Sequence, residues 1–346
     1  MANRIFKSVF VIALSVMLFS ACNNGNTPKQ AETKVVKIGS ILPLTGPIAG
    51  YGNFAKQGQQ KAIEDLNKMQ TDFKFELALE DGKSEGKEAV TAYQKLRGEG
   101  LDIITAGSSA MCMPVLPLAV KEKVLYFPSA SHPDINKEVS PFVFRNFVTA
   151  AQEVPLILSA IDSSKKGKTV LITVNDDFGK GFASKVDEIK SQYKGVNLVM
   201  ETTAEKKETD FTVLVQKIKQ VKPDNVIIVS YGKSAGSLVN KLSEQKINCN
   251  IYVSFSYLLT EANKVALSNT GIKCVTMDAG NVDVKEASDY ATIFLIGKTI
   301  IETKSSSVDS IASHLVKMTT FNANGIVMSF QPNHDILPTA KLITLQ

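Results

Sequence analysis

The sequence predicts an α/β protein made of two Rossmann-like lobes, each with a parallel central sheet, and three observations lead to this fold class. Short β-branched apolar runs alternate with helix-like segments, and this alternation occurs twice along the chain. The runs VLITV (170–174) and NVIIVS (225–230) are apolar on both faces, as in strands buried inside a parallel sheet. The chain has 346 residues, enough for about two domains, and 44% of them are hydrophobic, as in ordinary globular proteins.

The first strand-and-helix series occupies the N-terminal part of the chain. Its helix at 51–69 carries small and apolar residues on one stripe, and a second helix at 85–98 follows Ser84, a suitable N-cap residue. Strands joined through helices form right-handed crossovers, so we expect a parallel sheet covered on both faces. The strands of this series are predicted at 35–44, 74–79, 102–106 and 124–127.

A second series follows, and its clearest helix spans 209–221. Phe211, Val215 and Ile218 lie on one apolar face of that helix, and Pro223 comes just after it, where a helix has to end. We expect the tail beyond this series to pack back on the first lobe. Strands of the second series are predicted at 168–174, 197–202, 225–231, 251–255 and 272–277, and the tail is predicted to hold helices at 286–304 and 308–320 and strands at 325–330 and 339–345.

The N-terminal segment has the features of an export signal. Arg4 and Lys7 precede an apolar run that is too short to span a membrane as a helix. The sequence LFSAC (18–22) resembles a bacterial lipobox, so we expect Cys22 to be lipidated and to become the new N-terminus; ordinary secretion with a chance cysteine is the alternative. The predicted parts are a signal peptide at 1–21 and a flexible tether at 22–34, which has almost nothing apolar to bury.

Charge and composition exclude several classes of function. The formal net charge of +5 is mild, and Lys and Arg are scattered among 34 acidic residues, so nothing indicates a nucleic-acid partner. Three histidines leave little material for a metal site. The sequence has no GxGxxG after a strand, no GxxxxGK[ST], no HExxH and no CxxC. We therefore expect neither a metal nor a cofactor.

The sequence gives little support for an enzyme that uses nucleophilic catalysis. Ser131-His132-Pro133-Asp134 brings Ser, His and Asp together in sequence, but a catalytic triad depends on spatial rather than sequential order. There is also no GxSxG elbow. Gly179 and Gly181 open a helix and suit either an anion cradle or a simple tight turn. We expect a protein that is not an enzyme, with a hydrolase as the unfavoured alternative.

Cysteines other than Cys22 give one further hypothesis. Cys249 and Cys274 each stand at the start of a predicted strand, with one βα unit between them. An exported compartment permits disulfides. We therefore hypothesise a Cys249–Cys274 bridge, and two buried free thiols are the alternative.

Small polar and aromatic residues follow the predicted strands of both lobes. Ligands of open α/β sheets bind beyond the carboxyl ends of the strands, so the natural site is the cleft between the lobes. Hydroxyls and helix N-termini suit a carboxylate, and aromatics suit an apolar side chain; ordinary turn and cap residues would give the same pattern. The strand-end residues are Tyr51, Ser108, Ser109, Ser129, Ala130, Ser131, Asp176, Phe178, Tyr231 and Ser256.

Several long stretches resemble one known family. They are VKIGSILPLTGPIAGYGNFAKQGQQKAIEDLN (36–67), FELALEDGKSEGKEAV (75–90), VLYFPSASHPDI (124–135), VNDDFGKGFASKV (174–186), ETDFTVLVQKIKQVKPDNVIIVSYG (208–232) and FNANGIVMSFQPNHD (321–335). In them the chain is similar to type I periplasmic solute-binding proteins of ABC importers, typified by the leucine/isoleucine/valine-binding protein. The resemblance implies two lobes joined by a three-crossover hinge that closes on a small ligand. The implied lobes are 35–148 plus 279–323 and 149–278 plus 324–346.

The resemblance also implies ligand contacts. The stretch 129–131 matches the part that holds the α-carboxylate and ammonium of the ligand with hydroxyl and backbone groups. Tyr51, Phe178 and Tyr231 match aromatic positions that line the cleft from the two lobes. The loop after Gly107 supplies further backbone contacts.

The chain departs from the family pattern in places that affect the ligand. Met111 or Cys112 stands where the family usually has a serine, and Ser256 stands where amino-acid binders often carry a Glu for the ammonium. Glu261 lies close in sequence and is a candidate substitute. An ammonium without a carboxylate is costly in a dry cleft, so a small amide, carboxylate or peptide-like solute is an alternative ligand. The segment 277–290 is shorter than usual.

The function expected from the resemblance is that of a lipid-anchored, exported solute-binding protein. It captures a small amino-acid-like ligand, closes by hinge motion and delivers the ligand to ABC permease subunits as a monomer. One alternative keeps the fold and makes the chain a sensor lipoprotein that signals to a receptor. Another is a degenerate member that no longer closes on a ligand, because of the shortened 277–290 segment.

Overall fold

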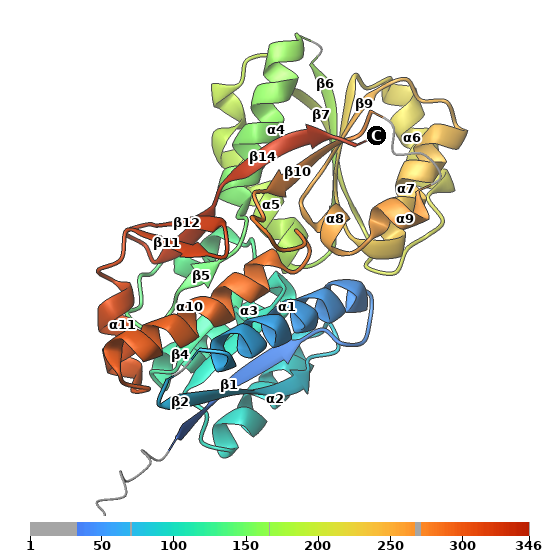
Figure 1. Cartoon of the computed structure of the whole chain (residues 1–346). Helices are drawn as coiled ribbons and strands as arrows, with labels where there is room; N and C mark the ends of the chain where they lie inside the picture. The colour runs from blue at the N-terminus through green and yellow to red at the C-terminus, as the bar shows by residue number, and fades with distance from the viewer. Residues whose placement is uncertain (1–32, 70, 166, 267–270, 346) are drawn as a thin grey trace, which may run out of the picture. The chain divides into compact units, whose positions relative to one another are not determined.

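A computed structural model describes residues 33–69, 71–165, 167–266 and 271–345 of the chain. The predicted signal peptide and Cys22 lie outside the described residues. Within them the chain forms an α/β fold with two sheets of mainly parallel strands and a third, small sheet (Figure 1). We call the part built on the first sheet the first lobe and the part built on the second sheet the second lobe.

The sheet of the first lobe has the strand order β2-β1-β3-β4, and all its strands run parallel. Its strands confirm the four predicted for this part of the chain. They are β1 (Lys34–Leu42), β2 (Phe73–Asp81), β3 (Ile103–Gly107) and β4 (Leu125–Ser129), and the helices of this part are α1 (Ala49–Asn67), α2 (Gly86–Gly98) and α3 (Ser109–Lys121).

Both faces of this sheet are covered, because successive strand residues point to opposite sides. Ile104 and Tyr126 belong to the cluster under α2 and α3, whereas Ile103 and Phe127 belong to the cluster under α1. A late helix, α10 (Ala287–Thr303), contacts α1 on that second face and runs beside it (Figure 1). The short 277–290 segment therefore does not leave the first lobe uncovered.

The second lobe has the strand order β14-β10-β9-β8-β6-β7, in which β14 runs antiparallel to its neighbour and the other pairs are parallel. The strands β6 and β8 are buried almost along their whole length, which confirms the prediction from their apolar sequences. The strands are β6 (Lys168–Val174), β7 (Asn197–Ala204), β8 (Asn225–Val229), β9 (Asn250–Val253), β10 (Lys273–Met277) and β14 (Ala340–Thr344). The helices are α4 (Ala150–Ser164), α5 (Asp177–Ile189), α6 (Thr212–Val221), α7 (Gly232–Glu244), α8 (Ser256–Leu259) and α9 (Ala262–Val265).

The tail of the chain forms a small third sheet with the order β11-β12-β13-β5. The strands β5, β11 and β13 are not predicted from the sequence, because they are too short to show a period, and the helix predicted at 308–320 ends earlier, as α11. The elements are β5 (Arg145–Asn146), α11 (Val308–Leu315), β11 (Thr320–Ala323), β12 (Ile326–Phe330) and β13 (Asp335–Pro338), with short 3-10 turns at Pro133–Asn136 and Lys190–Gln192.

The chain passes between the two lobes three times: from β5 to α4, from β10 to α10 and from β13 to β14. A buried ion pair fixes the first and third passages to each other, because Arg145 of β5 holds Asp335 of β13 through two hydrogen bonds of 2.8 and 2.7 Å. The predicted lobe boundary at 323/324 falls between β11 and β12, which pair with each other.

The strand register contradicts the hypothesised disulfide. Cys249 and Cys274 are both free. Cys274 of β10 lies opposite Val253 of β9 in a parallel pair, four residues beyond Cys249. Four residues of strand span roughly 13 Å, whereas the Cα atoms of bridged cysteines lie within about 7 Å. The N-cap prediction is also wrong: α2 begins after Glu85, and the Ser84 hydroxyl instead donates to the Thr45 carbonyl oxygen at 2.8 Å.

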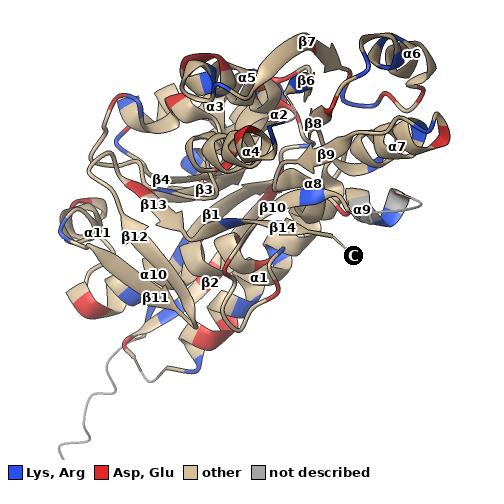
Figure 2. Cartoon of the chain, turned by 90° about the horizontal axis from the view of Figure 1, so that it is seen from above, with Lys and Arg blue, Asp and Glu red and all other residues tan. Residues whose placement is uncertain are grey.

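Charged residues of both signs are interspersed along the outer helices (Figure 2). Many of them form exposed pairs within one helix, such as Lys185 with Glu188 and Lys241 with Glu244. Such pairs contribute little to stability, and they leave the surface mixed in sign. Among the described residues, no helix is both long enough and apolar enough to cross a membrane.

Candidate functional site

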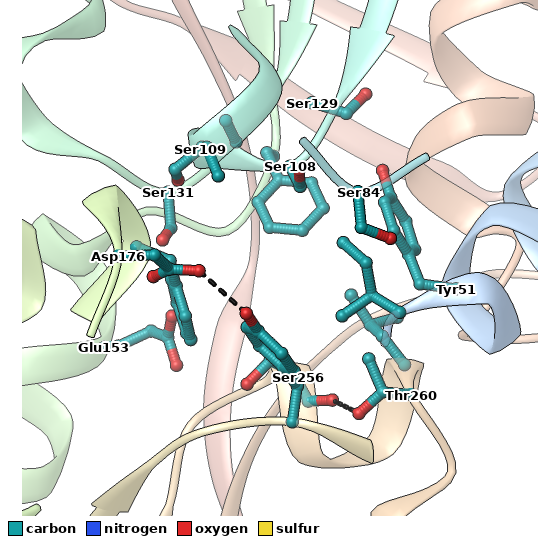
Figure 3. A pocket seen from close by; sticks show the side chains of 17 residues that line it. Tyr51, Ser84, Ser108, Ser109, Ser129, Ser131, Glu153, Asp176, Ser256 and Thr260 are labelled. Carbon is teal, nitrogen blue, oxygen red and sulfur yellow. Dashed lines mark hydrogen bonds between the residues drawn. The ribbon is translucent and has the colours of Figure 1, made fainter. Parts of the chain in front are cut away.

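A pocket lies where the carboxyl ends of strands from both sheets meet. Its lining surrounds about 570 Å³ of space that no protein atom fills, part of which is open to solvent. The residues that line it follow β1, β2, β3 and β4 in the first lobe and β6, β8 and β9 in the second, or lie on the passage from β5 to α4 (Figure 3). They are Ile48, Tyr51, Ser84, Ser108, Ser109, Ala110, Ser129, Ala130, Ser131, Phe147, Glu153, Asp176, Phe178, Tyr231, Ser256, Leu259 and Thr260.

Serine hydroxyls dominate the part of the lining that the first lobe contributes. We call Ser84, Ser108, Ser109, Ser129 and Ser131 the hydroxyl wall. Ser108 joins β3 to α3 with a φ of 73°, a backbone angle that favours glycine, and its N–H donates to the carbonyl oxygen of Ser129 at 3.0 Å. The hydroxyl oxygens of Ser108 and Ser131 are buried and have no hydrogen-bond partner in the described chain. Beside the N-terminus of α3, such hydroxyls suit a negatively charged group.

A buried network holds Tyr51 in place at the edge of this wall. Its hydroxyl donates to Asp289 of α10 at 3.3 Å, and the side-chain amide of Gln59 donates to the other oxygen of Asp289 at 3.0 Å. Burial raises the pKa of Asp289 to about 6. The ring of Tyr51 meets that of Phe147 edge to face, with 6.4 Å between centroids. The aromatic surface of the pocket is therefore fixed from α10, far along the chain.

Two carboxyl groups stand on the second-lobe side of the pocket, and we call Glu153 and Asp176 the carboxyl wall. Asp176 caps α5 by accepting from the N–H of Gly179 at 3.1 Å, and it accepts from the hydroxyl of Tyr231 at 2.8 Å. Glu153 of α4 is 1% exposed and accepts from the N–H of Phe255 at 2.7 Å. Burial raises the pKa of Asp176 and raises that of Glu153 to about 8.

Aromatic rings and a bonded serine complete the second-lobe side. Phe178 and Tyr231 stack with 6.3 Å between centroids, which gives an apolar surface between the polar groups. The hydroxyl of Ser256 is already used, because it donates to the carbonyl oxygen of Ser230 at 2.8 Å and lies 2.7 Å from the hydroxyl of Ser254. Thr260 accepts from the N–H of Gly232 at 2.6 Å.

The structure brings most of the predicted site residues together and removes two. The seven that line the pocket are Tyr51, Ser129, Ala130, Ser131, Phe178, Tyr231 and Ser256. Met111 and Cys112 do not line it: residues 109–121 form a helix, and the two side chains point from its first turns into the core against the sheet. The thiol of Cys112 lies 3.2 Å from the carbonyl oxygen of Ala106, and a Cβ on Gly82 would lie 2.5 Å from the terminal methyl of Met111.

Two other candidates that the sequence suggested are absent from the pocket lining. Glu261, the suggested partner for an ammonium group, forms ion pairs with Lys264 at 2.6 Å and Lys285 at 3.5 Å. His132 accepts the N–H of Asp134 at 3.2 Å through Nδ1, while the hydroxyl oxygen of Ser131 has no partner among the described residues. The adjacent Ser, His and Asp therefore do not form a triad in this structure.

Glu153 also lines the pocket, although it was not among the residues predicted from the strand ends. A signal for it is present in the sequence, since Glu153, Ile157 and Ile161 recur at intervals of four and lie on the buried face of α4. A carboxyl group on an apolar helix face is unusual enough to notice. Among the described residues, no group of three or more His, Cys, Asp or Glu side chains is placed to hold a metal ion.

Known proteins with similar sequences support one family. The periplasmic binding protein family matches residues 35–294 of the chain. The Leu/Ile/Val-binding protein BraC3 of Rhizobium johnstonii is 31% identical over 224 residues, which are 62% of this chain and 60% of that protein. The leucine-, isoleucine-, valine-, threonine- and alanine-binding protein of Pseudomonas aeruginosa is 25% identical over 60% of this chain and 57% of its own length. The chain thus spans about 60% of the length of the curated relatives it matches.

Solved structures establish the fold over nearly the whole described chain. The branched-chain amino acid transporter substrate-binding protein LivJ from Streptococcus pneumoniae, in complex with isoleucine, has a TM-score of 0.79 at 21% identity and covers 90% of this chain and 97% of its own. A solute-binding protein of an ABC transporter from Rhodopseudomonas palustris, in complex with 3,4-dihydroxybenzoic acid, has a TM-score of 0.79 at 19% identity, with 90% and 93% coverage. A type 1 periplasmic binding protein from Bordetella pertussis has a TM-score of 0.80 at 17% identity, with 89% and 96% coverage. The fold is that of the type I periplasmic binding proteins.

Proposed function

The chain belongs to the periplasmic binding protein family, and we propose that it captures a small amino-acid-like solute between its lobes and delivers it to an ABC importer. The observation that carries this proposal is the set of buried hydroxyls without partners at the hydroxyl wall. Ser131 is 2% exposed and the hydroxyl of Ser108 is buried, yet neither hydroxyl has a hydrogen-bond partner in the part of the chain that the structure describes. A buried polar group left without a partner is costly, so a ligand that accepts from these hydroxyls gains the bonds that the chain does not make.

Capture proceeds by closure in this proposal and involves no covalent step. Tyr51 contributes to the lining from the first lobe and Tyr231 from the second, so a ligand contacts both lobes at once. Such a ligand favours the closed arrangement over an open one, because only the closed arrangement offers both sets of contacts. We take the lobes to be 35–148 plus 279–338 and 149–278 plus 339–346, with the third boundary at the passage from β13 to β14 instead of the expected 323/324, and the lobes would turn about the three passages.

We further propose that the chain is exported and held on a membrane by lipid on Cys22, and that it acts as a monomer with its permease. The support is the lipobox-like sequence LFSAC (18–22). Metabolic labelling with a fatty-acid analogue should label the chain and should fail with Cys22→Ala. Crosslinking in cells should capture permease subunits rather than a receptor. Labelling of Cys22→Ala, or export without lipid, would contradict the anchor but not ligand binding.

Ligand binding is tested by thermal unfolding of the purified chain against a panel of compounds. The panel holds the branched-chain amino acids, alanine, threonine, short amides, small peptides and aromatic carboxylates, and any ligand from the cell is first removed by unfolding and refolding. A compound at about 100 times its Kd stabilises the fold by about 2.7 kcal/mol, which shifts Tm by a few degrees in a chain of this size. We expect a selective shift with amino-acid-like compounds.

The control variant for this panel is Ser243→Ala. Ser243 is an exposed serine of α7 outside the pocket, so its removal should leave every shift unchanged. Failure of the whole panel to shift Tm would contradict the proposed capture of a small amino-acid-like solute.

A further inference from the structure

The charge of the pocket lining is one-sided. Of the residues that line it, Glu153 and Asp176 carry carboxyl groups, and none is Lys, Arg or His. Neither carboxyl group takes part in an ion pair in the described part of the chain. A buried carboxylate without a cation is expensive to keep ionised. The lining therefore contains no positive charge that would stabilise these two groups in their ionised form.

Glu153 is the less satisfied of the two carboxyl groups. Asp176 already accepts two hydrogen bonds within the chain, one from the N–H of Gly179 at the start of α5 and one from the hydroxyl of Tyr231. Glu153 accepts one hydrogen bond, from the N–H of Phe255 to Oε2. Its other oxygen, Oε1, accepts none in the described chain, and Figure 3 shows the carboxyl group directed toward the interior of the pocket.

The position of Glu153 places it close to the hydroxyl wall. The N–H of Ala150, in the first turn of α4, donates to the carbonyl oxygen of Ser131 at 3.1 Å, and Glu153 follows Ala150 by three residues. The unpartnered hydroxyl of Ser131 and the carboxyl of Glu153 both line the pocket, on two segments of the described chain that this hydrogen bond joins. A ligand that reaches both has to carry a donor for the carboxyl and an acceptor for the hydroxyl.

We propose that Glu153 binds an ammonium group of the ligand. The pocket then selects aminated solutes over plain carboxylates and neutral amides. This inference deepens the proposed function and rests on it. Glu153 then supplies the carboxylate for the ammonium. Ser256 stands where amino-acid binders often carry that carboxylate, and Glu261 was the suggested substitute. The hydroxyl of Ser256 is bonded to Ser230, and Glu261 is paired with lysines outside the pocket.

If Glu153 binds an ammonium group, ligand binding is coupled to the release of a proton. A purely structural role of Glu153 would show no such coupling. Burial raises the pKa of Glu153 to about 8, so the empty pocket holds a proton on this group near pH 7. An ammonium favours the ionised carboxylate, so binding releases that proton, and affinity rises with pH by up to about tenfold per unit below pH 8. Among the described residues, the other titratable groups of the lining are Tyr51, Asp176 and Tyr231, and Cys274 of β10 interacts electrostatically with Glu153.

The test is titration calorimetry of the full chain with two matched pairs of probes: L-isoleucine with 3-methylpentanoate, and L-leucine with 4-methylpentanoate. Each pair differs by the ammonium group alone. We expect the amino acids to bind, the deaminated acids to bind at least about 30-fold more weakly, and Glu153→Gln to lose about that factor for the amino acids only. Titrations in two buffers of different ionisation enthalpy should show proton release at pH 7 in the parent chain and none in Glu153→Gln.

The matched control is Glu64→Gln, on an exposed position of α1 outside the pocket, which should behave as the parent chain. Urea unfolding at pH 7.5 should find Glu153→Gln at least as stable as the parent, so that lost binding is not lost folding. Binding of a deaminated acid as tightly as its amino acid, or Glu153→Gln within threefold of the parent, would overturn the inference and leave the proposed function intact. Failure of every panel compound and every probe would instead overturn the proposed function.

Discussion

The two sides of the pocket differ in chemistry although they are built by the same rule. Most residues of both sides follow the carboxyl ends of parallel strands, whereas Glu153 lies in the first turn of α4, just after the passage from β5. The hydroxyl wall offers neutral donors beside the N-terminus of α3, whereas the carboxyl wall offers Glu153 and Asp176. A ligand with both an anionic and a cationic group can bind both walls at once. The contrast between the walls would then fix the orientation of the ligand in the pocket. The predictions below test this contrast, from the largest expected effect to the smallest.

The carboxyl wall should make stability depend on pH, and the hydroxyl wall should not. An acid with a raised pKa holds its proton in the folded chain and releases it in the unfolded chain. Glu153 therefore lowers the free energy of unfolding as pH rises from its usual pKa near 4.5 toward about 8, by up to about 1.4 kcal/mol per unit. Glu153→Gln should reduce this slope in the ligand-free chain, measured by urea unfolding at pH 5, 6, 7 and 8.

Ser131→Ala serves as the matched comparison, since a hydroxyl does not titrate in this range, and its stability should follow the parent slope. Asp289 also has a raised pKa, about 6, and stays in both variants, so a smaller slope of the same sign persists. Equal slopes in the parent and in Glu153→Gln would mean that the carboxyl group of Glu153 is not held in its neutral form.

Ser131→Ala should weaken ligand binding without weakening the fold. A hydrogen bond to a charged group contributes about 1.5–3 kcal/mol, so loss of this hydroxyl should raise the Kd of a carboxylate-bearing ligand by about 10- to 100-fold. The ligand-free chain should be as stable as the parent or slightly more stable, because the buried hydroxyl has no partner there among the described residues. Calorimetry and urea unfolding measure the two effects. Parent-like affinity would remove Ser131 from the binding site, and Ser243→Ala controls for the loss of a serine.

Strand ends were the predictable part of the site. The strand predicted at 168–174 is β6 itself, and Ser131 and Tyr231, which follow predicted strands, line the pocket. Apolar β-branched runs identify buried parallel strands directly. The residues at the carboxyl ends of these strands can then be read from the sequence without further information.

Other features depend on packing between segments far apart in the chain. Glu153 lies on a helix rather than at a strand end, and its hydrogen-bond partner Phe255 is 102 residues away. The strands β5 and β13 are short and gain their pairing from the passages between lobes, so they show no period of their own. Asp289 supports Tyr51 across 238 residues, and local sequence holds no sign of that contact.

The smallest effect is expected within α3, where neighbouring residues separate pocket from core. Ser109 faces the pocket and Met111 faces the sheet, since the helix turns its side chains by about 100° per residue. Met111→Leu conserves volume in a packed core, so it should cost less than about 1.5 kcal/mol of unfolding free energy and leave ligand affinity unchanged. Urea unfolding and calorimetry on the same sample measure both. A tenfold loss of affinity would return Met111 to the ligand site that the family resemblance assigned to it, and would mean that the first turn of α3 moves when ligand binds.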